Sequence, residues 1–425
     1  MKRFLIGLLA GALALVVLVW YLNIRGEDRI HDAPPLPAPT AQQIERGAYL
    51  AGLGNCAGCH TARGGTPYAG GRGIETPFSV LYSTNLTPDR ATGIGDWSAD
   101  NFWRALHNGR SRDGRLLYPA FPYPNYTLVT RADSDALFDF LRSQRPVSQS
   151  AKPHGLSWPF SSQAALAVWR ALYFKPGTFV DNAARPADWN RGAYLVEGLG
   201  HCSACHTQRN ALGASSNMLD LSGGLIPMQN WYAPALTSPA EAGVADWPLD
   251  HVVRVMQSGV SPRGTVLGPM AEVVANSTQH WNADDLRAMA VFLKALPQVA
   301  PAAAPERVAA VDPGKAQRGA KLYEQHCVQC HGDQGQGVPG AYPPLAGNRA
   351  VQLNETSNLV QVVLYGGFPP ATAGNPRPFG MPPYVLALSD SDVAAVLTHL
   401  RSSWGNKAAP VSEVDVVRKR TGGAQ

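Results

Sequence analysis

All six cysteines of this chain fall in one repeated pattern, in which two residues separate the cysteines and a histidine follows the second. The pattern occupies residues 56–60, 202–206 and 327–331. Two thiols one helical turn apart can add to the two vinyl groups of one porphyrin, and the adjacent imidazole then reaches the iron as its proximal ligand. The spacing therefore predicts three covalently attached c-type haems. The expected attachment residues are Cys56, Cys59, Cys202, Cys205, Cys327 and Cys330, and the expected proximal ligands are His60, His206 and His331.

Three other uses of paired cysteines fit the pattern less well. A structural zinc site needs two pairs close together, and its fourth ligand is not ordinarily the residue beside a cysteine. A thioredoxin-like redox motif needs a βαβ setting, and no strand pattern dominates this sequence. Disulfides suit an exported chain, but they do not explain a histidine after every pair. Haem attachment accounts for all three motifs at once.

The second axial ligand of a high-potential haem is often a methionine, whose sulfur raises the reduction potential. Met381 in FGMPPY follows the third motif, and Met270 in LGPMAEV occupies the matching place after the second. Because this position recurs ahead of a closing helical pattern, Met270 and Met381 are the expected distal ligands. Met228 competes for the second haem, and Met218 is a weaker competitor.

The loop after the first motif departs from this arrangement. It reads LYPAFPY, with Phe121 in the ligand position, and the first repeat contains no methionine after Cys56. Phenylalanine cannot bind iron, so the first haem is expected to be five-coordinate or to take its sixth ligand elsewhere. His107 is the nearest histidine and His154 lies farther along the chain. A lone histidine near a helix end is also a common structural residue.

The elements that position these motifs repeat three times, with a period that indicates domain duplication rather than a solenoid. Each motif is preceded by a short helical pattern that contains Arg-Gly-Ala, and each repeat closes with a capped apolar helical pattern. Between the motif and the closing helical pattern, each repeat has a similar loop that contains a leucine, namely Leu86, Leu236 or Leu345. Asp96-Trp97 in the first repeat also matches Asp246-Trp247 in the second. Backbone carbonyls near Asn85, Pro234 and Pro344 are the expected hydrogen-bond acceptors for the proximal imidazoles.

The predicted fold is all-α, with three tandem class-I-like cytochrome c domains behind an N-terminal transmembrane signal anchor. The expected boundaries are a signal anchor at 1–24, a Pro-rich spacer at 25–40, domain 1 at 41–145, an inter-domain segment at 146–185, domain 2 at 186–298, an Ala/Pro linker at 299–313, domain 3 at 314–405 and a C-terminal tail at 406–425.

The N-terminus predicts export and membrane attachment. Lys2 and Arg3 precede an uncharged apolar run at residues 4–22, which is long enough to span a bilayer. The small-residue cleavage site at 12–14 lies inside the run, so an uncleaved anchor is favoured over a cleaved signal peptide. The basic start should stay in the cytoplasm. We expect a single-pass protein of the bacterial inner membrane with its haem domains in the periplasm.

Composition excludes some other classes of protein. Apolar residues make up 45% of the 425 residues and charged residues 16%, which suits a packed core rather than disorder. The formal net charge is +5, without a dense run of lysine and arginine, so no nucleic-acid partner is expected.

With its three motifs, LYPAFPYPNY, NWYAPALTSP, the Met270 loop and WGN after the last helical pattern, the chain resembles the triheme cytochrome c subunit of membrane-bound, quinoprotein-type alcohol dehydrogenases. The resemblance covers about residues 40–410. It implies that electrons come from a catalytic subunit bearing pyrroloquinoline quinone and pass to ubiquinone. Similar chains accompany flavin-dependent gluconate or sorbitol dehydrogenases and molybdenum-dependent aldehyde or N-heterocycle hydroxylases. The family loop usually reads LYPAMPY, and its alcohol dehydrogenase members commonly have a cleaved signal.

The main hypothesis is an electron-transfer subunit with three haem c groups and no catalytic residues of its own, joining a periplasmic dehydrogenase to ubiquinone or another respiratory acceptor. One alternative is a free-standing membrane-anchored shuttle to a terminal oxidase. Another is a peroxidase-like enzyme in which the first haem has a vacant sixth position and His107 is the candidate acid–base group.

Overall fold

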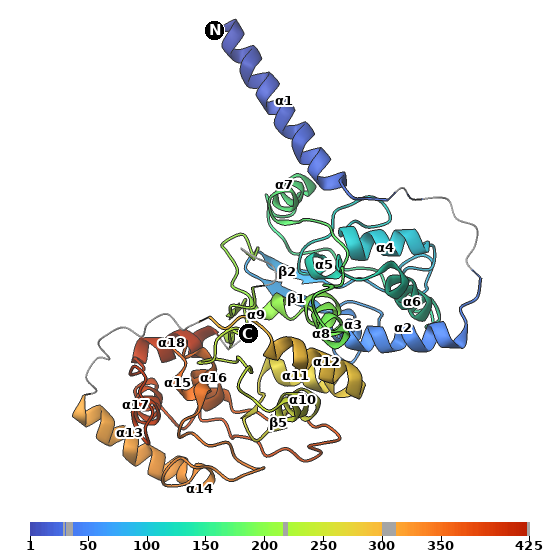
Figure 1. Cartoon of the computed structure of the whole chain (residues 1–425). Helices are drawn as coiled ribbons and strands as arrows, with labels where there is room; N and C mark the ends of the chain where they lie inside the picture. Colours follow the sequence, from blue (N-terminus) through green and yellow to red (C-terminus); the bar gives the residue numbers. More distant parts are fainter. Residues whose placement is uncertain (29, 31–36, 216–219, 300–311, 423–425) are drawn as a thin grey trace. The chain divides into compact units, whose positions relative to one another are not determined.

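The computed structural model describes residues 1–28, 30, 37–215, 220–299 and 312–422 (Figure 1). These residues form two compact units. Unit 1 comprises residues 1–185, 193–204 and 210–218, and unit 2 comprises 186–192, 205–209 and 219–425. Much of the expected Pro-rich spacer, Met218 and most of the expected Ala/Pro linker lie outside the described residues.

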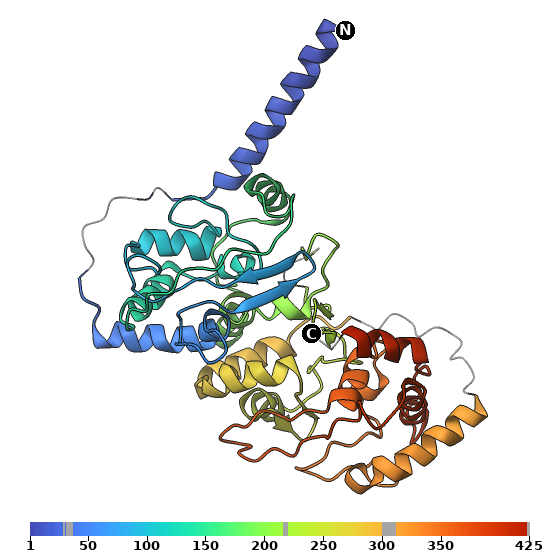
Figure 2. The same cartoon turned by 180° about the vertical axis from the view of Figure 1, so that it is seen from behind.

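Helices dominate the described part of the chain, as the all-α prediction required (Figures 1 and 2). The helices through the second motif are α1 (Lys2–Ile24), α2 (Ala41–Leu53), α3 (Cys56–His60), α4 (Ala99–Asn108), α5 (Tyr123–Tyr126), α6 (Arg131–Arg142), α7 (Gln163–Tyr173), α8 (Ala187–Ala193), the π-helix η1 (Tyr194–Leu199) and α9 (Ser203–His206). Those that follow are α10 (Leu249–Ser258), α11 (Pro269–Asn276), the 3-10 helix η2 (Thr278–His280), α12 (Ala283–Lys294), α13 (Pro313–His326), α14 (Val328–His331), α15 (Arg349–Gln352), α16 (Ser357–Tyr365), α17 (Asp390–Ser402) and α18 (Glu413–Gly422).

Three short antiparallel hairpins, which the sequence did not predict, accompany the helices in the described residues. They pair β1 (Gly73–Thr76) with β2 (Ser79–Tyr82), β3 (Gly224–Ile226) with β4 (Trp231–Ala233), and β5 (Val260–Ser261) with β6 (Gly264–Thr265). Their strands have two to four residues, too few for an alternating apolar pattern to stand out.

The helix before each motif packs against the helix that closes the repeat, and the Arg-Gly-Ala sequence explains how. A Cβ atom on the glycine would overlap the carbonyl oxygen of an alanine in the closing helix, so only glycine lets the backbones approach this closely. The glycine–alanine pairs are Gly47 with Ala136, Gly192 with Ala288 and Gly319 with Ala395. Two of these pairs lie in unit 2 and one in unit 1.

The arginine beside each glycine makes an ion pair with the closing helix. Its partner is the aspartate three residues after the N-cap of that helix, where a carboxylate also suits the helix dipole. The ion pairs are Arg46–Asp133, Arg191–Asp285 at 2.7 Å and Arg318–Asp392 at 2.7 Å. The caps are Thr130, Asn282 and Ser389, each accepting a hydrogen bond from the aspartate N–H.

The cores lie where these helix pairs cross. Leu137 and Leu141 of α6 are buried in unit 1, and Leu286 and Met289 of α12 are buried in unit 2. A further cluster in unit 2 joins α16 and α17. Residues 406–425, expected as a tail, instead include α18, whose Val416 is fully buried in this cluster. The helix is too short and charged for its single buried row to be recognised from sequence.

Helix α1 is long and apolar enough to cross a membrane, and it is the one such helix among the described residues. A signal sequence near an N-terminus meets the same criteria. Its apolar side chains from Phe4 to Tyr21 are mostly exposed, and Figure 1 shows the helix projecting from unit 1.

Candidate haem sites

Each Cys-x-x-Cys-His motif forms a short helical turn, in α3, α9 and α14. The chain enters the first two turns through a left-handed residue, Asn55 at φ 48° and His201 at φ 37°. None of the six cysteines, all of which lie in the described residues, is bonded to another. Each turn therefore places two cysteines beside a histidine, at the spacing seen in the sequence.

A backbone carbonyl orients the imidazole of each motif. The Nδ1 atoms of His60, His206 and His331 lie 2.8, 2.7 and 3.1 Å from the carbonyl oxygens of Thr84, Pro234 and Pro343. If Nδ1–H donates to the carbonyl, the lone pair of Nε2 is left for a metal. The expected acceptor Pro234 is the one found, and the other two lie one residue before the expected Asn85 and Pro344.

The loop that carries this carbonyl is built in the same way after every motif. The backbone oxygen of the motif histidine accepts a hydrogen bond from Gly70 N–H at 2.7 Å, Gly223 N–H at 2.8 Å or Gly337 N–H at 2.8 Å. These glycines have φ of 77°, 81° and 64°, which a side chain would strain. The turn after the histidine is thus fixed by a residue without a Cβ.

The leucines singled out from the sequence complete that loop. Leu86, Leu236 and Leu345 donate their N–H groups to the carbonyls of Tyr68, Leu221 and Gly335 at 2.8, 2.9 and 2.7 Å. The spacing along the chain is the same in each repeat. The residue whose carbonyl accepts the imidazole hydrogen bond lies two positions before the leucine. The residue whose carbonyl accepts the leucine N–H lies two positions before the glycine that follows the motif. The weak sequence likeness of these loops therefore reflects one shared arrangement of hydrogen bonds around the histidine.

The protonation states of the motif residues suit a covalent haem. Burial lowers the pKa of His60, His206 and His331, against the opposing effect of the carbonyl hydrogen bond, and favours the neutral imidazole that binds metals. Burial, with the neighbouring thiol second, raises the pKa of Cys56 to about 12 and of Cys327 to about 11. The uncharged thioether that a thiol forms with a porphyrin vinyl group fits such a buried setting.

Comparison with known proteins agrees with these sites. The cytochrome c family model matches residues 44–145 and 316–404. The alcohol dehydrogenase (quinone) cytochrome c subunit of Gluconobacter oxydans is 40% identical over 403 residues, covering 90% of this chain and 83% of that protein. The gluconate 2-dehydrogenase cytochrome c subunit of Pantoea cypripedii is 37% identical and covers 89% of each chain. The fructose dehydrogenase cytochrome subunit of Gluconobacter japonicus is 32% identical over 100% of this chain and 91% of that one.

The chain belongs to the cytochrome c subunits of membrane dehydrogenase complexes. Electron transfer is the function of such a subunit, and cysteines and a histidine at this spacing are the residue types that a haem c requires for attachment and ligation.

In this cytochrome subunit, tyrosine hydroxyls tether two of the loops that follow the motifs. The Tyr126 hydroxyl lies 3.4 Å from the carbonyl oxygen of Gly54, just before the first motif. The Tyr384 hydroxyl donates at 2.8 Å to the carbonyl of His326, just before the third. Neither tyrosine was singled out from the sequence, although each stands a few residues after the expected ligand position, in FPYPNY and MPPY.

The expected ligand positions, Phe121 and Met381, lie close in sequence to these two tyrosines. Burial raises the pKa of Tyr126, and the charges of Cys56 and Cys59 add to that shift. The pKa of Tyr384 is raised in the same way by burial and then by Cys327 and Cys330. The Phe121 ring lies 5.3 Å from the Tyr126 ring. Met381 packs on the same core cluster as Tyr384.

The methionines expected at the second motif occupy different settings. Met270 is half-buried in the first turn of α11. Gly268, just before that helix, has φ 57°, and a side chain there would overlap the Trp231 ring. Met228 stands on the β3–β4 turn with φ 62°, and about half of its surface is exposed. Met270 is therefore the more buried of the two residues.

The rings of His107 and His154 contact aromatic side chains in unit 1. The buried ring of His107 stacks on Trp103 at 4.3 Å, and burial lowers its pKa. Its Nδ1 atom has no hydrogen-bond partner among the described residues. His154 accepts a hydrogen bond from Tyr82 N–H at 3.2 Å, which ties it to β2.

Proposed function

We propose that this chain is a triheme electron-transfer subunit that takes electrons from a periplasmic catalytic dehydrogenase and passes them to ubiquinone or another respiratory acceptor. The observation that carries the proposal is the threefold recurrence of the imidazole–carbonyl contact, with the same glycine and leucine hydrogen bonds around it. Each bound haem c would supply a one-electron couple. The three haem domains would occupy residues 41–145, 186–298 and 314–405.

The axial ligands that the chain supplies would give the three haems different reduction potentials. The six motif cysteines hold the porphyrins, and His60, His206 and His331 are the proximal ligands. Met270 and Met381 are the distal ligands of the second and third haems. Phe121 takes the corresponding place at the first haem, which is then left five-coordinate or is ligated by His107, whose unpartnered Nδ1 is compatible with that role.

The proposed location is the inner membrane, with α1 as an uncleaved single-pass anchor and the haem domains in the periplasm. Its 23 residues correspond to roughly 34 Å of helix, against about 30 Å for the hydrocarbon core. Lys2 and Arg3 precede the span and favour a cytoplasmic N-terminus.

Purification of the full-length chain from detergent-solubilised membranes tests the dehydrogenase assignment. We expect a larger catalytic subunit with pyrroloquinoline quinone, flavin or molybdenum to accompany it, and its organic substrate to reduce the haems. The relatives act with alcohol, gluconate and fructose dehydrogenases, so those three substrates are the first to try. A chain that purifies alone, and whose haems no dehydrogenase of the same membranes reduces, would instead support a free-standing shuttle to an oxidase.

A further inference from the structure

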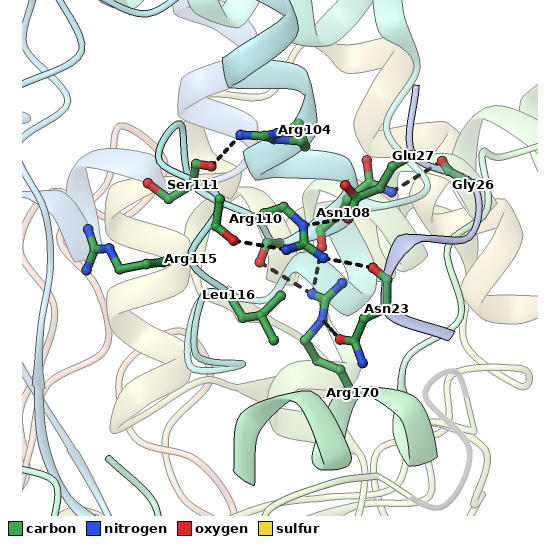
Figure 3. Close-up of polar contacts among 12 residues, drawn as sticks. Asn23, Gly26, Glu27, Arg104, Asn108, Arg110, Ser111, Arg115, Leu116 and Arg170 are labelled. Carbon is green, nitrogen blue, oxygen red and sulfur yellow. Dashed lines mark hydrogen bonds and ion pairs between the residues drawn. The ribbon is translucent and has the colours of Figure 1, made fainter. Parts of the chain in front are cut away.

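A buried polar cluster joins the C-terminal end of α1 to the rest of unit 1 (Figure 3). Asn23, the last polar residue of the helix, is 6% exposed, and Arg170 of α7 is 2% exposed. Arg170 Nε donates to the Asn23 side-chain oxygen at 3.0 Å, and the Asn23 amide donates to the Ala167 carbonyl at 2.9 Å. A buried guanidinium needs such partners, so the contact between α1 and α7 is a specific one.

A second pair of charges strengthens the same junction. Arg110 makes an ion pair with Glu27 at 2.7 Å and donates to the Asn23 carbonyl at 3.0 Å, and both charged side chains are largely buried. Arg25 donates to the Phe174 carbonyl at 3.2 Å, just after α7 ends. Removal of residues 23–27 would leave Arg110 and Arg170 buried without these partners, a costly state.

The junction fixes the level of α7 relative to the apolar helix. Trp20 and Tyr21, both exposed, are the last aromatic residues of α1, and such residues favour the membrane–water interface. Asn23 follows Tyr21 by two residues, or about 3 Å along the helix axis. Because α7 contacts α1 at Asn23, it lies at the depth where the headgroups of a bilayer spanned by α1 would be.

The side of α7 that faces away from the junction is apolar. Ala164, Val168 and Leu172 recur every four residues and form one exposed row, which we call the α7 stripe. Val168 is 48% exposed and Leu172 is 66% exposed. The exposed Lys175 follows the helix and suits anionic headgroups. Figures 1 and 2 both show α7 lying across the end of α1 rather than along it, as an interfacial helix lies relative to a spanning one.

We propose that the α7 stripe lies in the outer surface of the bilayer at the foot of α1, so that the first haem domain is held against the membrane at a fixed orientation. This inference rests on the proposed anchoring of α1. The occupant of the stripe is lipid because the stripe adjoins the one candidate membrane span among the described residues, at the level of its aromatic end.

Photocrosslinking tests the proposal with the full-length protein in phosphatidylcholine vesicles that contain a diazirine-bearing acyl chain. Lipid adducts are mapped by peptide mass spectrometry. We expect adducts on α1 and on Val168 or Leu172, and none on the exposed face of α2 around Glu45. The double variant Val168→Glu/Leu172→Glu should lose most of the α7 adducts and keep those of α1. The variant Leu225→Glu, at an exposed leucine of β3, should change neither.

The outcomes separate the two ideas. Adducts on α1 without adducts on α7 would overturn the inference while the anchor stands, and would point to a protein subunit as the cover of the stripe. Absence of lipid adducts from both helices would contradict the proposal that α1 anchors the chain in the membrane. Adducts on α7 that persist in the double glutamate variant would show that contact does not depend on the stripe, and would also overturn the inference.

Discussion

Gly47 of α2 lies directly against the backbone of Ala136 in α6. A Cβ atom at residue 47 would overlap the Ala136 carbonyl oxygen and approach the Phe140 side chain. The same relationship holds between Gly192 and Ala288 and between Gly319 and Ala395. Because the helix before each motif carries the chain into the cysteines, this close crossing sets where each motif begins.

Gly47→Ala should therefore destabilise unit 1, although alanine is the better helix former. The added methyl group meets backbone rather than a flexible side chain, so the helices must separate, at a cost of about 1–3 kcal/mol. Gly52→Ala is the matched control on the same helix, because a Cβ there meets nothing within 4 Å. It should be neutral or stabilise by up to about 1 kcal/mol. Urea unfolding of the two variants measures the difference, and equal midpoints would contradict the close crossing.

The motifs identified the cytochrome family from sequence alone, because covalent haem attachment needs fixed spacing along the chain, and the comparisons confirm that family. Pro234 was expected as an acceptor for His206 and is the residue found, since a short loop leaves few carbonyls within reach. The tethering tyrosines Tyr126 and Tyr384 were not foreseen, because their contacts join segments 58 to 72 residues apart. The α1–α7 junction was missed for the same reason, as Asn23 and Arg170 are 147 residues apart.

The carboxyl group of Glu197 should make stability depend on pH. Burial raises its pKa from 4.5 to about 7. Between these values the folded chain holds a proton that the unfolded chain releases, so this contribution is fully present below pH 4.5 and is lost as the pH rises through 7. The loss should be on the order of 2–3 kcal/mol. Urea midpoints measured between pH 5 and 8 should decline for the natural protein more than for Glu197→Gln. A Glu45→Gln control, at an exposed residue, should keep the full decline.

Intact-mass measurement of protein matured by a working haem-attachment system should give the chain plus three haems. The double variant Cys202→Ala/Cys205→Ala should lose the mass of one haem, because both thioether positions of the second motif are removed. Its remaining two haems should keep their reduced absorption spectra. A natural protein that carries two haems, or a double variant that still carries three, would contradict the assignment of one haem to each motif.

Phe121 should make the first haem unlike the other two. No methionine is present in residues 41–145 to bind its iron, so its reduction potential should be lower and its sixth position weakly held or vacant. In the ferrous protein about one haem in three should bind carbon monoxide rapidly. Phe121→Met should abolish that reaction and add a methionine-ligated haem to the spectrum, because the loop is already tethered through Tyr126. The exchange is close to volume-conserving and should cost less than about 1.5 kcal/mol of stability.

Two further variants decide what holds the first iron. Met381→Phe copies the natural first loop into the third repeat, so it should raise the number of carbon-monoxide-reactive haems by one while leaving the first haem unchanged. His107→Ala should accelerate carbon monoxide binding only if the Nδ1 atom of His107 is the sixth ligand, and should otherwise affect stability alone through the lost contact with Trp103. Three methionine-ligated haems in the natural protein would refute the assignment, since the first repeat has no methionine to provide the third sulfur.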